Sequence, residues 1–281
     1  MHFAKYHALG NDYIVINPAD LPGSLSVSEI RLICHRNYGI GSDGILLGPL
    51  DAKEADFALR IFNPDGSEAE KSGNGLRIFA RYLWDQGLVG DEAFPVMTPG
   101  GKVTCRVHRG GCSVTVEMGE VSFDSTRVPV LGPPREVVNE TVEVAGKEFT
   151  FCAATIGNPH CVILRDAVSR DEATRYGPLI ETDPRFPNRT NVQFMKILDR
   201  NNIQIEIWER GAGYTLASGS SGSAAAAVAR KLGLCDPEIT VHMPGGAIHI
   251  TVSEQFSVVM SGPVLKVADG TIAEESFRQV V

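Results

Sequence analysis

Alternating apolar and polar residues predict a chain built largely from short strands. Residues 111–118, 202–207 and 249–252 alternate with period two, which is typical of strands with one buried face. Such segments outnumber the predicted helices in both halves of the chain. The pattern therefore favours the α+β class.

Two other segments have the apolar content of buried helices. Residues 75–87 are apolar almost all round, and residues 222–233 form an alanine-rich run that can let another element pack close to it. A glycine ends each run, as is common at helix C-termini. We expect one central helix in each half.

An internal repeat organises the chain. The dipeptide Ser-Gly at 72 recurs 146 positions later at 218, and Gly-Leu at 87 recurs at the same spacing at 233. The run L-G-N-D-Y-I-V-I from residue 9 is similar to I-G-N-P-H-C-V-I from residue 156. The Pro/Gly-rich stretch 128–134 is the best candidate for the connection between the halves.

The repeat predicts two pseudo-symmetric domains, each a curved, mostly antiparallel sheet around a central helix, with a cleft between them. The first is expected to comprise residues 1–120 plus 265–281 and to carry Ser72. The second is expected to comprise residues 121–264 and to carry Ser218.

Composition narrows the class of partner. The chain has 281 residues, 43% hydrophobic and 21% charged, as in a globular protein with a substantial core. A net charge of −8 without a Lys/Arg-rich block disfavours nucleic acid and anionic membranes. There is no apolar run of spanning length and no signal-peptide pattern at the N-terminus. We expect a cytoplasmic protein that binds a small molecule.

The cysteines do not indicate a disulfide framework or a metal site. They are scattered, and no C-x-x-C or paired Cys/His spacing occurs. We expect buried, reduced thiols, and no metal. The six positions are Cys34, Cys105, Cys112, Cys152, Cys161 and Cys235.

Candidate chemistry lies at the start of the two helices. Each begins at a Gly-rich turn after a serine, where backbone N–H groups lack intrahelical partners and the helix dipole is positive. If both turns face one cleft, they can bind an anion, and a carboxylate fits because the sequence has no P-loop motif. Either turn alone is equally consistent with a simple tight turn.

Amide side chains and one charged pair indicate which kind of molecule carries the anionic group. Four asparagines lie where strands meet loops, and Glu209 and Arg210 follow an alternating strand. Donors and acceptors together suit a zwitterionic amino acid, although each asparagine alone is also a common turn former. The four are Asn11, Asn63, Asn158 and Asn191.

These residues carry a resemblance to a known family. The segments F-N-P-D-G-S-E-A-E-K-S-G-N-G (62–75), G-N-P-H (157–160), E-R-G-A-G-Y-T-L-A-S-G (209–219) and L-G-N-D-Y (9–13) resemble diaminopimelate epimerase. The resemblance covers essentially the whole chain. It implies a pyridoxal-independent amino-acid epimerase in lysine biosynthesis, converting the LL to the meso isomer without cofactor or metal, and reasonably a homodimer.

The resemblance also implies roles for particular residues. The distal amino-carboxylate end of the substrate falls to Asn11, Asn63, Asn158, Asn191, Glu209 and Arg210. Backbone N–H groups for the reacting end fall to Gly73, Asn74, Gly219 and Ser220. In the family, one cysteine thiolate removes the α-proton and a second thiol delivers a proton to the opposite face.

The chain departs from the family at the two proton carriers. The cysteine positions fall at Ser72 and Ser218. A thiol has a pKa of about 8.5, whereas an alcohol is several units more basic and is almost never ionised near neutrality. The change should severely depress ordinary epimerisation.

Three interpretations therefore stay open at the level of sequence. The first is an epimerase-like isomerase with serines at both base positions. The second is a lyase, dehydratase or other isomerase on the same scaffold, since in related proline racemases a hydroxyl at one cysteine position is associated with dehydration. The third is a non-catalytic amino-acid-binding protein.

Overall fold

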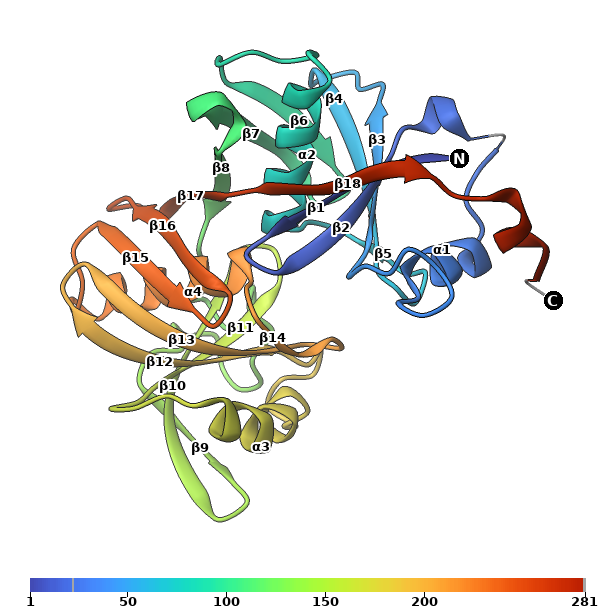
Figure 1. The fold of residues 1–281 in the computed structure, drawn as a ribbon. Coiled ribbons are helices and arrows are strands. Elements are labelled where there is room, and N and C mark those ends of the chain that lie inside the picture. Colours follow the sequence, from blue (N-terminus) through green and yellow to red (C-terminus); the bar gives the residue numbers. More distant parts are fainter. Residues whose placement is uncertain (22, 280–281) are drawn as a thin grey trace. The chain divides into compact units, whose positions relative to one another are not determined.

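The computed structural model describes residues 1–21 and 23–279, and the chain forms two compact units. Unit 1 comprises Met1–Val116 and Gly262–Val281, and unit 2 comprises Glu117–Ser261. Both units combine many strands with few helices (Figure 1), which confirms the α+β class.

Unit 1 is a mixed sheet with two α-helices, α1 (Val27–Cys34) and α2 (Gly73–Asp85). Its strands pair in the order β18-β1-β2-β3-β4-β6-β7-β8, with β5 also on β4. The pairs β2–β3 and β4–β6 are parallel and the others antiparallel. The strands are β1 (His2–Ala8), β2 (Asn11–Ile16), β3 (Ile45–Leu50), β4 (Phe57–Phe62), β5 (Glu68–Ala69), β6 (Phe94–Thr98), β7 (Gly101–His108), β8 (Ser113–Glu120) and β18 (Leu265–Thr271).

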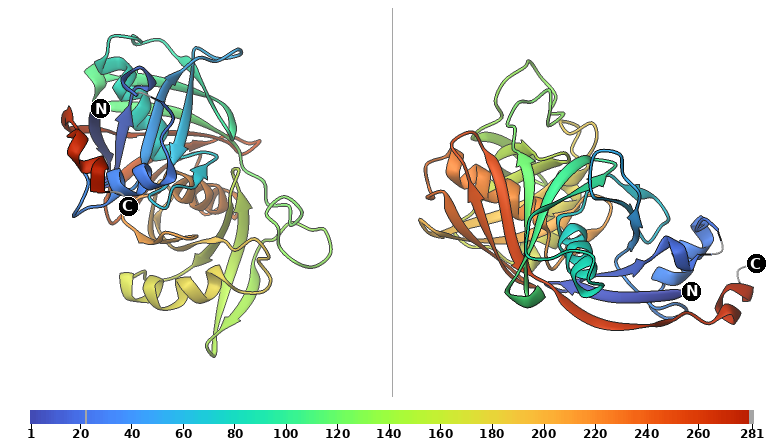
Figure 2. Two further views of the ribbon diagram at one scale, coloured as in Figure 1. Left: turned by 90° about the vertical axis from the view of Figure 1, so that its right-hand side faces the viewer. Right: turned by 90° about the horizontal axis from the view of Figure 1, so that it is seen from above.

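Unit 2 repeats this topology with α3 (Arg170–Glu181) and α4 (Gly219–Lys231). Its strands pair in the order β9-β10-β11-β12-β13-β15-β16-β17, with β14 also on β13. The parallel pairs β11–β12 and β13–β15 occupy the same two places in the order as those of unit 1. The β9–β10 hairpin and α3 can be followed in Figure 2. The strands are β9 (Glu140–Val144), β10 (Lys147–Thr155), β11 (Pro159–Leu164), β12 (Asn191–Asp199), β13 (Asn202–Glu209), β14 (Gly213–Thr215), β15 (Glu238–Met243), β16 (Gly246–Val252) and β17 (Ser257–Pro263).

The central helices α2 and α4 have equivalent ends. Each has 13 residues and begins directly after a serine N-cap, two or three residues earlier than the sequence pattern predicts. Each is followed by a glycine in the left-handed region, Gly87 at φ 69° and Gly233 at φ 68°. The amide after each glycine returns to a helix carbonyl, as in a Schellman cap.

Each central helix packs inside the curve of its own sheet. Helix α2 contacts β1, β2, β3 and β7, and α4 contacts β10, β11, β12, β13, β15 and β16 (Figure 1). The alanines 224–227 of α4 are completely buried. A Cβ on Gly222 would lie 2.8 Å from Cδ1 of Ile248, so the small residues allow β16 to approach the helix closely.

The prediction of one central helix in each half is confirmed, and each unit also contains one further α-helix, α1 or α3. Two other expectations need correction. The stretch 128–134 is not a connection, because it lies within unit 2 and its Val128 and Val130 belong to the unit 2 core. Cys112 is exposed, whereas the other five cysteines are buried, and all six are free.

None of the helices in the described residues is long and apolar enough to cross a membrane.

Candidate functional site

Ser72 and Ser218 cap the two central helices in the same way. Both have extended backbone, with φ −137° and −146°. The Ser72 Oγ accepts a hydrogen bond from the Gly75 N–H at 3.0 Å, and the Ser218 Oγ accepts one from the Ser221 N–H at 3.3 Å. Each hydroxyl therefore lies at the positive end of a helix dipole, where negative charge is stabilised.

The immediate neighbours of both serines are further hydroxyls. The Tyr13 hydroxyl lies 3.2 Å from the Ser72 Oγ, and the Ser220 Oγ lies 3.4 Å from the Ser218 Oγ. Cys161, in contrast, is a completely buried core residue of β11, and burial raises the pKa of its thiol well above the usual value. Cys161 is therefore not a substitute proton carrier.

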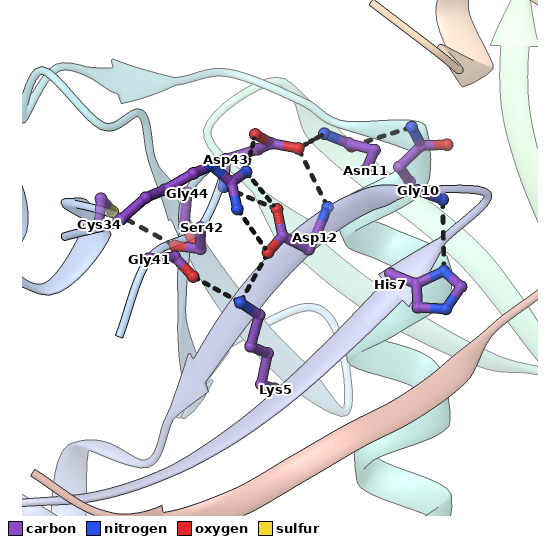
Figure 3. A network of polar contacts seen from close by, with 12 residues as sticks. Lys5, His7, Gly10, Asn11, Asp12, Cys34, Gly41, Ser42, Asp43 and Gly44 are labelled. Atoms are coloured by element: carbon purple, nitrogen blue, oxygen red, sulfur yellow. Dashed lines mark hydrogen bonds and ion pairs between the residues drawn. The ribbon is translucent and has the colours of Figure 1, made fainter. Parts of the chain in front are cut away.

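In unit 1, a chain of amides ties the start of α2 to the start of β2. The Asn74 Nδ2 donates to the Asn11 Oδ1 at 2.9 Å, and the Asn11 Nδ2 donates to the Asp43 Oδ2 at 2.9 Å (Figure 3). The completely buried Arg77 donates to the Asn74 Oδ1 at 2.8 Å, and burial lowers its pKa to about 10. Because Arg77 only donates and Asp43 only accepts, both amides have a fixed direction.

Asp43 belongs to a charged network that supports this amide chain (Figure 3). The Arg36 Nη2 bridges the Asp43 Oδ1 at 2.7 Å and the Asp12 Oδ1 at 2.8 Å, and the Lys5 Nζ lies 2.8 Å from the Asp12 Oδ2. Burial opposes ionisation of Asp12, but hydrogen bonds from Arg36 and Lys5 outweigh it and lower its pKa. The network holds the Asp43 carboxylate in place, and Asp43 in turn fixes the orientation of the Asn11 side chain.

Asn63 is placed differently from Asn11 and Asn74. It directly follows β4, as the strand pattern indicated, and its Nδ2 donates to the Ser67 Oγ at 3.0 Å. Its backbone N–H also bonds to the Ser67 carbonyl, so the hydrogen bonds described for Asn63 stay within one turn.

In unit 2, a second polar network joins the start of α4 to β11 and β12. The Asn158 Nδ2 donates to the Ser220 Oγ at 3.4 Å, and the Asn158 Oδ1 lies 3.0 Å from the His160 Nε2. The Gln193 Nε2 lies 3.1 Å from the His160 Nδ1 and donates to the Ser221 Oγ at 3.0 Å. The network therefore begins and ends in the first turn of α4.

His160 is a neutral member of this network. It is completely buried, and desolvation lowers its pKa to about 3. The positive charge of Arg210 acts in the same direction. The imidazole therefore acts as one donor and one acceptor at neutral pH.

The turn that carries Glu209 and Arg210 is held at several points. The Arg210 backbone N–H donates to the Asn191 Oδ1 at 2.9 Å, and the Asn191 Nδ2 donates to the Pro159 carbonyl at 2.8 Å. Asn191 thus joins the turn to the start of β11. Glu209 is half-buried, and the exposed Arg210 reaches the Asn188 carbonyl at 3.0 Å.

A buried carboxylate on α3 completes the support of this turn. Glu181 accepts from the Gly211 N–H at 3.0 Å, the Trp208 Nε1 at 2.7 Å and the Arg189 guanidinium at 2.9 Å. Arg210 lies between Trp208 and Gly211, which both donate to Glu181, so the backbone of Arg210 is positioned before a ligand binds.

Sequence reasoning missed most of these supporting residues. His160 lies within the G-N-P-H motif but received no role, and Gln193 is a polar residue between the apolar Val192 and Phe194, which is a usable signal of a buried network. Asp43 and Glu181 lack such a signal, because Asp43 lies in a loop and Glu181 ends a largely polar helix, where charged residues are common. Among the described residues, no three His, Cys, Asp or Glu side chains form a group that could hold a metal ion.

Comparison with known proteins identifies the family. The family model of diaminopimelate epimerase matches residues 3–123 and 152–267. The chain is 62% identical to "Diaminopimelate epimerase 2" of Nostoc sp. over 99% of this chain and 97% of that protein. The chain belongs to the diaminopimelate epimerase family.

A more distant relative belongs to the same family, and a solved structure shares the fold. Diaminopimelate epimerase of Moorella thermoacetica is 40% identical over 96% of this chain and 98% of that protein. The crystal structure of a hydroxyproline epimerase from Agrobacterium vitis superposes with a TM-score of 0.69 at 15% identity, covering 97% of this chain and 90% of that chain. The latter similarity concerns the fold alone. Thus this member of the diaminopimelate epimerase family shares its fold with a wider set of proteins.

The buried, neutral His160 predicts a specific loss of stability in acid. Its pKa is about 3 in the folded protein and about 6.5 when unfolded, so only the unfolded state gains its proton between these values. The contribution of His160 to the free energy of unfolding is complete above about pH 6.5. It decreases as the pH falls towards about 3, by up to about 1.4 kcal/mol per pH unit. Urea unfolding of the wild type between about pH 7 and pH 4.5 should show this slope.

The matched variants separate His160 from the carboxylates that also titrate. His160→Gln should remove its part of the slope, whereas His249→Gln, at an exposed position of β16, should leave the slope unchanged. Equal slopes in the two variants would contradict the assignment of a neutral buried imidazole.

Proposed function

We propose that this protein is a diaminopimelate epimerase-like isomerase that interconverts the LL and meso isomers of diaminopimelate, or acts likewise on a similar amino acid, in lysine biosynthesis. The observation that carries the proposal is 62% identity to "Diaminopimelate epimerase 2" across almost the whole chain. The polar networks at both helix starts support it, because they supply the donors and acceptors that a zwitterion needs.

Substrate binding is proposed to use two sets of groups. The α-carboxylate accepts from N–H groups in the first turns of α2 and α4, contributed by Gly73, Asn74, Gly219 and Ser220. The distal amino and carboxylate groups contact side chains from both units, namely Asn11, Asn63, Asn158, Asn191, Glu209 and Arg210. The hydrogen bonds of Asn11, Asn158 and Asn191 within the protein support this role, since they orient these amides in advance.

The proton transfer is proposed to occur at Ser72 and Ser218, without pyridoxal or metal. One group removes the α-proton, the carbanion is stabilised by the N–H groups that bind the carboxylate, and the other group protonates the opposite face. Helix dipoles and N-cap hydrogen bonds favour the alkoxide at both positions. They do not close a gap of several pKa units, so the reaction should be slow.

The remaining parts of the proposal concern assembly and location. We propose that the two units are the two half-repeats, that Ser72 and Ser218 approach one α-carbon, and that the protein works as a homodimer in the cytoplasm. The matching strand order of the units supports the first part.

The activity is tested by α-hydrogen exchange in deuterated water. Diaminopimelate and a panel of other amino acids are incubated with the protein and followed by NMR. We expect loss of the α-proton signal and appearance of the other stereoisomer, with diaminopimelate the best substrate. Water loss would instead indicate a lyase, and binding without exchange would indicate a non-catalytic binding protein.

Arg210 should anchor the distal carboxylate of the substrate. Its guanidinium can make two parallel hydrogen bonds, which the single ammonium of lysine cannot reproduce. Arg210→Lys should weaken diaminopimelate binding by about 2 kcal/mol, measured by calorimetry. An unchanged dissociation constant would contradict this role.

Restoring thiols at both base positions should restore fast chemistry. Ser72→Cys combined with Ser218→Cys should greatly raise epimerisation of diaminopimelate, with a pH profile that reports a lowered thiol pKa. Each single variant serves as a control and should gain much less, because one thiol lacks an efficient partner on the opposite face. A double variant that binds diaminopimelate without exchange or inversion would show that the site differs beyond these two atoms.

A further inference from the structure

We propose that Gln193 is a positioning residue that sets the direction of the hydrogen bonds through His160, so that Asn158 presents its NH₂ group to the first turn of α4. Asn158 is thereby a donor for an oxygen of the distal substrate carboxylate. This role of Asn158 rests on the function proposed above, whereas the direction of the hydrogen bonds does not.

The first step of the argument is burial. Gln193 and His160 are both completely buried, Gln193 between Val192 and Phe194 on β12. Both faces of the strand are covered here, so bulk water does not satisfy these polar groups. Each hydrogen bond inside the network therefore depends on its protein partner.

The second step is the tautomer of His160. The Gln193 NH₂ group has two hydrogens and no acceptor, and its nitrogen lies 3.1 Å from the His160 Nδ1 and 3.0 Å from the Ser221 Oγ. The His160 Nδ1 must accept, so the hydrogen of the neutral ring lies on Nε2. The low pKa of His160 is consistent with a single ring hydrogen.

The third step carries the direction to the helix. The His160 Nε2–H donates to the Asn158 Oδ1 at 3.0 Å, which makes that oxygen the acceptor and leaves the NH₂ group on the other side. The Asn158 Nδ2 lies 3.4 Å from the Ser220 Oγ, beside the first turn of α4. Gln193 thus acts on Asn158 through His160 without needing any contact with a ligand.

The opposite direction has the opposite consequence. With a carbonyl or carboxylate oxygen at residue 193 facing Nδ1, His160 would donate from Nδ1 and accept at Nε2 from Asn158. The Asn158 Oδ1 would then take the place of the NH₂ group, and Asn158 could not donate to the distal carboxylate of the substrate. In the observed direction the Gln193 Oε1 is buried and has no hydrogen-bond partner among the described residues. The orientation in which the Gln193 NH₂ group donates to His160 and Ser221 therefore leaves one acceptor unsatisfied.

The experiment reads the tautomer directly. The protein is labelled with ¹⁵N-histidine, the His160 resonances are assigned by their loss in His160→Gln, and long-range ¹H–¹⁵N spectra show which ring nitrogen is protonated. Diaminopimelate affinity is measured by calorimetry on the same samples. In the wild type we expect a protonated Nε2 and an unprotonated Nδ1.

Gln193→Glu should reverse the network, because a carboxylate only accepts. We expect protonation at Nδ1 and about tenfold weaker diaminopimelate binding, the scale of one lost hydrogen bond to a charged group. The matched control is Gln255→Glu, the same change in charge at an exposed turn of unit 2, and it should alter neither reading.

A second variant keeps the test decisive if a buried glutamate prevents folding. Gln193→Met preserves length and removes the donor, so His160 should populate both tautomers and binding should weaken by about threefold or more. An Nδ1-protonated wild type, or a methionine variant with unchanged tautomer and affinity, would overturn the proposal. If the tautomer responds as expected but the wild type does not bind diaminopimelate, the positioning stands and the proposed substrate fails.

Discussion

The structure depends on the enclosure of one helix inside the curved sheet of each unit. This enclosure buries most of the helix, so the unpaired backbone N–H groups at its N-terminus need hydrogen-bond partners from side chains or a ligand. Strands surround α2 and α4, and most of their residues are buried. The first N–H groups of such a helix lack intrahelical partners. A serine N-cap satisfies one of them in each unit, and the remaining donors make both turns suited to bind an anion.

The two polar networks extend this logic to the side chains around each turn. In unit 1, Arg77 and Asp43 orient two amides from opposite ends, one as an obligatory donor and the other as an obligatory acceptor. In unit 2, the corresponding network is neutral and is directed by an amide through an imidazole. Both arrangements order side chains before a substrate binds, which reduces the entropy that binding must overcome.

Serine at both N-caps keeps the fold and the proposed substrate-binding groups but is poorly suited to proton transfer. A hydroxyl fulfils the capping role of the N-terminal residue, so the fold accepts it without strain. The pKa of the hydroxyl nevertheless stays too high for ionisation near neutral pH, because a helix dipole and one hydrogen bond do not lower it by several units. The family scaffold and its binding groups can therefore persist while the reaction rate changes by many orders of magnitude.

The sequence by itself determined the class, the central helices and the repeat. Strand alternation and the glycine stops are local signals, and they correctly predict α2, α4 and the strands that contain 202–207 and 249–252. Local patterning also misled, since the Pro/Gly-rich stretch 128–134 packs into the unit 2 core through its two valines, and Cys112 is exposed. Helices α1 and α3 went unnoticed although each has a serine N-cap followed three residues later by a glutamate.

Only the tertiary structure decided which polar side chains act together. Asp43 meets Asn11 across 32 positions, Gln193 meets His160 across 33, and Glu181 meets Gly211 across 30. No local pattern encodes these pairs, because strand pairing and helix docking bring them together after the chain has folded. The sequence could name the residues of both helix turns, but the direction of each hydrogen bond follows from burial, which removes water as an alternative partner.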